Sequence, residues 1–166
     1  NYAKHFQTNE PIPTELLHSV IEASRFNQGF DTQEYLAAAI LDLEWHTLTE
    51  GDIPNDIQAF EKNALAKYGL DNPAIPPRYK STYFAHIFTV GYAARYYAYI
   101  WSEVLAADAF AYMKEKGGAK AENGMPMREW ILSKGGSADP MHLYKSCFGR
   151  EPNPKHLLVR RGLEKA

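Results

Sequence analysis

Residues 31–48, "DTQEYLAAAILDLEWHTL", carry the clearest helical pattern in the chain. Asp31, followed three residues later by Glu34, forms a capping box, which marks the start of a helix. Behind it the apolar residues recur at spacings of three and four and form one stripe, which consists of Tyr35, Leu36, Ala39, Ile40 and Leu43. The pattern predicts an amphipathic helix from Asp31 to about Leu48.

The segments on either side of this helix also have helical spacing. Upstream, after the prolines at 11 and 13, the apolar residues are Leu16, Leu17, Val20 and Ile21, and "NQG" at 27–29 is expected to end the helix. Downstream, a helix is expected from about Asp56 to Tyr68, ended by Gly69, with Ile57, Phe60, Ala64 and Leu65 facing inward. Residues 70–80, "LDNPAIPPRYK", contain three prolines and predict an interior loop.

The second half of the chain predicts one long helix and several short ones. After a short helical or irregular piece at 81–88 and a break at "TVG", the long helix should run from about Tyr92 to Lys116. Short helices are expected at about 125–134 and after the pairs Asp139-Pro140 and Asn153-Pro154, in which a capping residue precedes proline. The sequence has no alternating strand pattern. We therefore predict an all-α fold of about six to eight helices in a single helical domain over residues 1–166.

Composition excludes two classes of partner. Eighteen basic and twenty acidic residues leave a formal net charge of -2, without the basic excess that a nucleic-acid phosphate backbone requires. The most apolar stretch, residues 82–101, is interrupted by His86, Gly91 and Arg95, so no membrane span is expected. The single cysteine, Cys147, cannot form an internal disulfide and suits a reducing compartment, which predicts a cytoplasmic protein.

The segment "HIFTVGYAARYYAYIW", residues 86–101, is unusually rich in phenols. On the predicted helix Tyr92, Tyr96 and Tyr99 would share one face. A protonated phenol can donate a hydrogen bond to a developing oxyanion, and the imidazole of His86 adds a further donor. The same pattern also fits an ordinary aromatic core whose hydroxyls bond to the backbone or to water, so the residues alone leave both interpretations open.

Several motifs in register extend this pattern over nearly the whole chain. They are "TNEPIPTELL" (8–17), "FNQGFDTQEYLAAAILDLEWHTL" (26–48), "TYFAHIF" (82–88), "GYAARYYAYIWSEVLAADAF" (91–110) and "ILSKGGSADPMHLYKSCFGREP" (131–152). Together they resemble the C-terminal part of the thimet oligopeptidase and peptidyl-dipeptidase family of zinc metallopeptidases. "YFAHIF" and "SEVLAADAF" are most similar to the bacterial peptidyl-dipeptidase branch.

The resemblance implies a helical enzyme with a deep channel, in which H-E-x-x-H and a later glutamate hold zinc. The six histidines, at 5, 18, 46, 86, 142 and 156, include no pair three or four residues apart, so no helical face offers two imidazoles to one metal. We therefore expect this chain to bind no metal and to be a fragment of a larger catalytic domain. The missing N-terminal and zinc-binding part of the same polypeptide would hold the zinc, and this chain would begin just after the zinc helices.

The resemblance also assigns roles to individual residues. His86 matches the histidine that contacts substrate, and Tyr92 and Tyr99 match the principal tyrosines that hydrogen-bond the substrate and the tetrahedral intermediate. Tyr96 is a secondary substrate-binding candidate, and Gly91 belongs to the family's glycine-rich loop.

Three positions depart from the family pattern. Thr89 and Val90 stand where glycines are common and restrict the backbone more than glycine does, which puts the loop's mobility in doubt. Arg95 stands where a small residue is common. It could bind a substrate carboxylate, although an exposed helical arginine is the simpler interpretation.

Three functional hypotheses follow. The first is the C-terminal segment of a zinc-dependent, peptidyl-dipeptidase-like oligopeptidase that cleaves an oligopeptide substrate, with the isolated chain inactive. The alternative is a stand-alone, non-catalytic helical module that binds peptides. A metal-free hydrolase with His86 as its base is the third hypothesis, but the sequence shows no identifiable nucleophile for it.

Overall fold

A computed structural model describes residues 3–89 and 91–165 of the chain. In this part the α-helices are α1 (Thr14–Ala23), α2 (Gln28–His46), α3 (Ile57–Ala66), α4 (Ala85–Thr89), α5 (Ala98–Glu115), α6 (Ala121–Met127), α7 (Pro140–Phe148) and α8 (Lys155–Arg160). A π-helical turn, Arg128–Leu132, continues α6, and 3₁₀ turns lie at Glu50–Asp52 and Ser81–Tyr83. Apart from an isolated bridge between Lys4 and Pro11, the described residues form no β-structure. The all-α prediction is confirmed.

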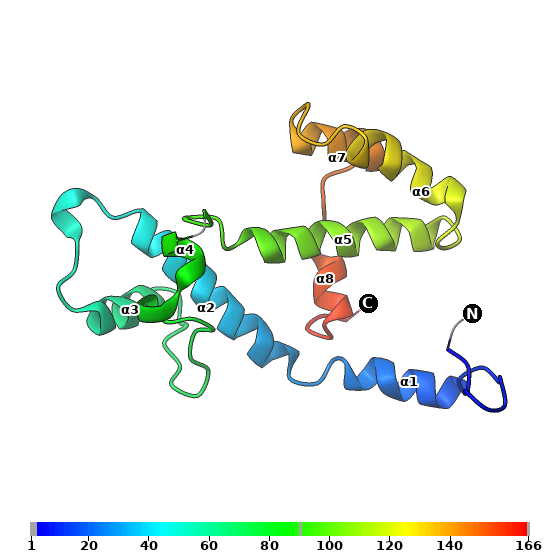
Figure 1. Cartoon of the computed structure of the whole chain (residues 1–166), viewed down its shortest axis with the longest axis horizontal. Coiled ribbons are helices and arrows are strands. Elements are labelled where there is room, and N and C mark those ends of the chain that lie inside the picture. Colours follow the sequence, from blue (N-terminus) through cyan, green and yellow to red (C-terminus); the bar gives the residue numbers. More distant parts are fainter. Residues whose placement is uncertain (1–2, 90, 166) are drawn as a thin grey trace.

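Helix α5 is the central element of the arrangement (Figure 1). The α6–α7 pair lies along one side of α5, and α8 lies on the opposite side. Helix α2 crosses near the N-terminal end of α5, and α3 and α4 lie beside α2. Helix α1 extends beyond the start of α2. This arrangement brings α2, α4 and the start of α5 together at one end of the molecule.

The core consists of small clusters between pairs of elements. Ala37 and Leu41 of α2 pack against Ala64 and Leu65 of α3. The other clusters join α2 to α4, α5 to α7 and α5 to α8. Ala64 and Leu65 therefore face inward as predicted, but Ile57 in the first turn of α3 is 40% exposed, so that part of the prediction is wrong.

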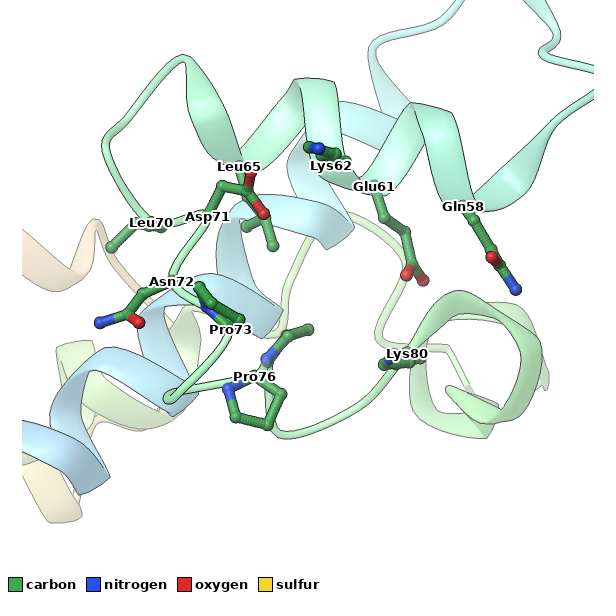
Figure 2. A pocket seen from close by; sticks show the side chains of 11 residues that line it. Gln58, Glu61, Lys62, Leu65, Leu70, Asp71, Asn72, Pro73, Pro76 and Lys80 are labelled. Atoms are coloured by element: carbon green, nitrogen blue, oxygen red, sulfur yellow. The ribbon is translucent and has the colours of Figure 1, made fainter.

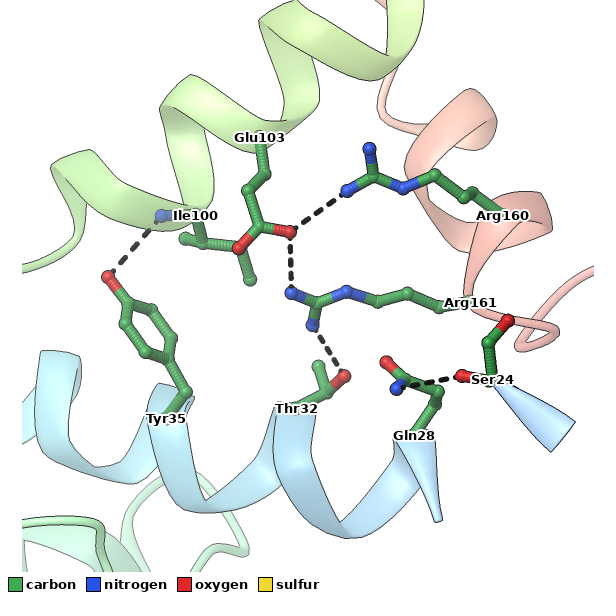
Figure 3. Close-up of polar contacts among 8 residues, drawn as sticks. All are labelled: Ser24, Gln28, Thr32, Tyr35, Ile100, Glu103, Arg160 and Arg161. Carbon is green, nitrogen blue, oxygen red and sulfur yellow. Dashed lines mark hydrogen bonds and ion pairs between the residues drawn. The ribbon is translucent and has the colours of Figure 1, made fainter. Parts of the chain in front are cut away.

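A polar junction ties α2, α5 and α8 together (Figure 3). The carboxylate of Glu103 on α5 accepts hydrogen bonds from Arg160 Nη2 at 3.1 Å and Arg161 Nη2 at 2.9 Å. Arg161 Nη1 also donates to the Thr32 hydroxyl of α2 at 2.7 Å. Arg161 thereby joins the end of α8 to both α2 and α5.

Several helix ends follow the sequence signals. The Asp139 side chain accepts from the His142 backbone N–H at 2.8 Å at the start of α7, and the Asp56 side chain accepts from the Ala59 N–H at 3.0 Å at the start of α3. Gly69, with φ of +68°, ends the turns after α3 in the left-handed region, which glycine adopts without steric cost. These termini were predictable because one local residue determines each of them, a capping side chain in two cases and a glycine in the third.

The predicted capping box of α2 is wrong. Helix α2 begins at Gln28, three residues before Asp31, and its N-cap is Asn27 with φ of +58°. The Asp31 backbone N–H already donates to the Asn27 carbonyl at 3.1 Å, as an interior helical residue does. The "NQG" signal that should have ended the preceding helix instead lies at the start of this one.

The predicted helix from Tyr92 is also wrong over its first six residues. Helix α5 begins at Ala98, and residues 93–97 form turns. Ala94 has a φ of +55°, which no α-helix contains. The reason is tertiary, because a side chain from α2 takes up the backbone N–H groups of this segment.

Within residues 3–89 and 91–165, no helix combines the length and the apolar character needed to cross a bilayer.

Candidate functional site

His86 lies on α4 at the centre of a group of aromatic rings. Its ring centroid is 5.4 Å from that of Tyr79, 5.7 Å from that of Tyr96 and 6.1 Å from that of Tyr92. The imidazole is half-buried, so its neighbours orient it while part of it remains accessible to a ligand.

Tyr92 and Tyr99 form a stacked pair beside this histidine. Their ring centroids are 5.4 Å apart with an interplanar angle of 16°. Tyr92 is half-buried and Tyr99 is 42% exposed. A hydrogen bond with the Tyr92 side chain raises the pKa of Tyr99, so this phenol stays protonated at neutral pH and can donate. The structure therefore brings together the two tyrosines that the sequence singled out, although they do not share a helix.

Tyr96 occupies a different environment from its two neighbours. Its side chain is 4% exposed and packs in the core with Tyr35 and Phe84. Burial raises the pKa of Tyr96 to about 12. Its ring contacts that of Tyr99 on the core side, at a centroid distance of 5.4 Å. Tyr96 therefore lies on the buried side of the group and not on its accessible face.

Gly91 connects α4 to the tyrosine turn. Its φ of +81° lies in a region that L-amino acids with a side chain rarely adopt. The Tyr92 backbone N–H then returns to the His86 carbonyl at 3.3 Å, which holds the histidine and the first tyrosine together.

Thr89 ends α4, where its hydroxyl donates to the Ala85 carbonyl at 2.6 Å. Val90 lies outside the described residues. Arg95 is exposed, and because it lies in the turn before α5, the expectation of a helical arginine at this position is wrong.

Sequence reasoning missed the residues that hold the tyrosine turn. Asp42 of α2 is fully buried, and its carboxylate accepts from the Ala94 and Tyr96 backbone N–H groups, each at 2.8 Å. His46 Nδ1 lies 2.9 Å from the same carboxylate. The available signal was an acidic residue between the apolar residues of "AILDLEW", because a buried aspartate needs partners.

Tyr79 was also missed, because it belongs to the proline-rich loop. Its ring lies within 6.4 Å of four others, namely Tyr83, Phe84, His86 and Tyr96, by centroid distance. An aromatic residue inside a polar, proline-rich segment was the only local signal for this contact.

The proline-rich loop also borders a cavity of about 350 Å³ against α3 (Figure 2). Acidic and basic side chains both line it, including Glu61, Lys62, Asp71 and Lys80. None of the lining residues is among the candidate site residues that the sequence singled out. The candidate site is therefore the half-exposed surface around His86, Tyr92 and Tyr99, and this cavity is separate from it.

The chain matches the model of Peptidase family M3 over residues 1–163. The chain belongs to this family. Family M3 consists of zinc metallopeptidases, so the resemblance seen in the motifs is confirmed.

The similar curated proteins are peptidases. The chain is 47% identical to the dipeptidyl carboxypeptidase of Escherichia coli over 98% of its own length, and 46% identical to that of Salmonella typhimurium over 99%. It is 34% identical to oligopeptidase A of Haemophilus influenzae over 96% of its length. The chain spans 24%, 24% and 23% of these three relatives, about a quarter of each.

Zinc, which the family implies, has no ligand set among the residues that the structure describes. Across residues 3–89 and 91–165, no three His, Cys, Asp or Glu side chains gather in a way that could hold a metal ion. His46 and His156, for example, each face a buried aspartate that is engaged elsewhere. The residues described here therefore do not fit a zinc site.

Proposed function

We propose that the polypeptide to which this chain belongs is a zinc-dependent peptidase of the peptidyl-dipeptidase type, and that this segment binds the peptide and stabilises the reacting carbonyl. The observation that carries the proposal is the group formed by His86, Tyr92 and Tyr99. These residues come from α4, a turn and α5, yet their side chains converge on one accessible surface. Membership of a peptidase family supports this interpretation over a structural aromatic cluster.

The phenols suit the transition state of peptide hydrolysis. Attack on the scissile carbonyl turns its oxygen into an oxyanion, and a neutral donor held close to it stabilises that charge without adding one of its own. Tyr99 is the principal donor because it is the more exposed of the stacked pair, and a phenol with an ordinary pKa near 10 is already protonated at neutral pH. Tyr92 orients Tyr99 and supplies a second donor.

The imidazole suits recognition of the peptide backbone. A half-buried histidine with fixed aromatic neighbours can donate to a substrate carbonyl while losing little side-chain entropy. We assign His86 to substrate binding, together with the backbone around Gly91. Tyr96 supports these groups from the core and does not itself contact substrate.

The relatives suggest the mode of cleavage. The two most similar proteins reported above are named dipeptidyl carboxypeptidases, and the sequence is closer to them than to oligopeptidase A. We therefore propose release of dipeptides from the C-terminal end of short peptides. The buried, unpaired thiol of Cys147 is compatible with the cytoplasm, which we propose as the location.

The remaining partner is the rest of the same polypeptide, which would supply the zinc site and the opposite wall of the cleft. Helix α1 supports this, because it contributes no buried residue and its apolar side chains are 42–55% exposed, namely Leu16, Leu17, Val20 and Ile21. An apolar stripe of this kind is normally covered by another element.

The test is to sequence the gene upstream of this segment, express the whole polypeptide and identify its products by mass spectrometry. We expect an in-frame H-E-x-x-H upstream and C-terminal dipeptides released from a short peptide. Internal cuts alone would contradict the dipeptidase assignment. A complete polypeptide that binds peptides without cleaving them would replace the proposal with a peptide-binding module.

A further inference from the structure

The tyrosine turn, residues 92–97, takes its shape from one face of α2. Tyr35 and Asp42 are seven residues apart, which is about two helical turns, so both side chains point to the same side. Both are buried, Asp42 completely and Tyr35 with 9% exposure. A fully buried carboxylate is stable only when hydrogen bonds and charges compensate for the water it has lost.

The partners of Asp42 are in the turn. Oδ1 accepts from the Ala94 backbone N–H and Oδ2 from the Tyr96 backbone N–H, both at 2.8 Å. His46 Nδ1 faces Oδ1 at 2.9 Å from the solvent side. The two carboxylate oxygens thus hold the backbone on both sides of Arg95, where Ala94 adopts a left-handed φ of +55° that is unfavourable for alanine.

Tyr35 holds the next part of the turn. Its hydroxyl donates to the Tyr96 carbonyl and accepts from the Ile100 backbone N–H at 3.3 Å, the contact drawn in Figure 3. The N–H of Tyr96 therefore binds Asp42 and its carbonyl binds Tyr35. Helix α2 fixes both ends of this residue and the start of α5.

These contacts decide between two structures of the same segment. The local sequence favours a helix that continues α5 back to Tyr92, and in that helix the Tyr96 N–H would donate to the Tyr92 carbonyl. In the structure Asp42 takes that N–H, and the Tyr92 carbonyl accepts from Arg95 instead, at 2.8 Å. In a continuous helix the backbones of Tyr92 and Tyr99 would lie two turns apart, about 10 Å along the axis. In the structure the two rings stack on each other, with their centroids 5.4 Å apart.

We propose that Asp42, assisted by Tyr35, is the positioning residue of this site. By accepting hydrogen bonds from the backbone N–H groups of Ala94 and Tyr96, it makes α5 begin at Ala98 rather than at Tyr92 and brings the Tyr92 ring against the Tyr99 ring. Asp42 acts through the tyrosines and does not touch substrate. Its effect on peptide hydrolysis rests on the proposed function, but its effect on the geometry does not.

The geometric test uses this chain and needs no activity. Nuclear Overhauser contacts between the Tyr92 and Tyr99 rings should be present in the wild-type chain. They should be lost in Asp42→Asn, whose amide nitrogen cannot accept, and weakened in Tyr35→Phe, which lacks only the hydroxyl. Asp108→Asn is the matched control. Asp108 is equally buried, but it bonds Arg150 and Tyr144 near α7, so the ring contacts should survive its substitution.

The functional test is a double-mutant cycle in the complete polypeptide. Asp42→Asn should lower kcat at least as much as Tyr99→Phe does, because it displaces both donors, with a smaller change in KM, and the double variant should be no slower than Asp42→Asn alone. By contrast, any effect of Asp108→Asn on the activation free energy should add fully to that of Tyr99→Phe.

The outcomes separate the two claims. Ring contacts that persist in both Asp42→Asn and Tyr35→Phe, or that are absent from the wild type, overturn the positioning role. If Asp42→Asn does not fold, Tyr35→Phe alone decides. Loss of the contacts together with full activity of Tyr99→Phe would leave Asp42 as the organiser of the turn and would reject the proposed function.

Discussion

The two stacked phenols show how the environment of each residue separates the tyrosines of one short segment. Tyr92 and Tyr99 are partly exposed and adjacent, whereas Tyr96 between them is buried in the core. Equivalent spacing on a helix would have given all three a similar environment. This difference in exposure is why we propose that the first two contact the ligand and that the third supports them.

The proposed role of Tyr99 as oxyanion donor can be tested by removing only its hydroxyl oxygen. Tyr99→Phe in the complete polypeptide should lower kcat by about 100-fold, because one such donor contributes about 3 kcal/mol in the transition state, while KM should change much less. Steady-state kinetics with a short peptide measure both quantities. Tyr97→Phe is the matched control, since Tyr97 is 47% exposed but is not part of the stacked pair, and it should retain full activity. An unchanged kcat for Tyr99→Phe would remove this residue from the mechanism.

The buried phenol predicts an alkaline loss of stability. The pKa of Tyr96 is raised to about 12 in the folded chain, against about 10 in an unfolded one. The stability that the buried, neutral Tyr96 contributes to the free energy of unfolding is therefore fully present below about pH 10 and is lost as pH rises through about 12. Urea unfolding between about pH 9 and 12 should show a shallower decline for Tyr96→Phe than for the wild-type chain. Equal slopes would mean that the tyrosine is not buried as described.

At the scale of single elements, the helix starts that follow a local signal are those whose capping side chain bonds the first turn, whereas the helix expected at about 125–134 begins earlier, at Ala121. Asp139 and Asp56 cap α7 and α3 where the sequence places them. The starts of α2 and α5 shift by three and six residues from their predicted positions, α2 to an earlier residue and α5 to a later one. For α5 the reason is that Asp42, distant in sequence, competes for its first backbone N–H groups.

Two aspartates that the sequence predicted to cap helices should differ in their effect on stability. Asp139→Ala should lower the free energy of unfolding by about 1 kcal/mol, because a side-chain cap is lost. Asp31→Ala should cost only about 0.3 kcal/mol, since Asp31 lies inside the first turn of α2 and contributes mainly through the helix dipole. Urea denaturation of the chain measures both, and Asp139→Asn, which keeps an acceptor, should lie near the wild type. Equal losses of unfolding free energy for the two alanine variants would mean that Asp31 caps α2 after all, as the capping-box pattern predicts.

At the scale of the whole molecule, the core is divided and much apolar surface remains exposed. Four small clusters join pairs of elements, and α1 adds no buried residue to any of them. The candidate site likewise presents one face, with phenols and an imidazole but without a set of metal ligands among the described residues. Both features fit a segment that works against another part of the same polypeptide.

The isolated chain should therefore be inactive. After purification in zinc-containing buffer and dialysis, it should carry no stoichiometric zinc by elemental analysis and should release no dipeptide from a substrate that the complete polypeptide cleaves. The complete polypeptide, treated in the same way, is the positive control. Zinc at one equivalent, or metal-dependent cleavage by the chain alone, would contradict the assignment of the metal site to another part of the polypeptide.

The sequence alone determined the all-α class, the helix ends with a local cap or glycine, and the family, because each depends on nearby residues or on motifs in order. It also singled out His86, Tyr92 and Tyr99. Only the tertiary structure decided that these tyrosines meet across a turn, that Tyr96 is buried, and that Asp42 and Tyr35 hold the turn. Local propensity favours a continuous helix through residues 92–116, and a carboxylate some fifty residues away outweighs it by taking up two backbone N–H groups.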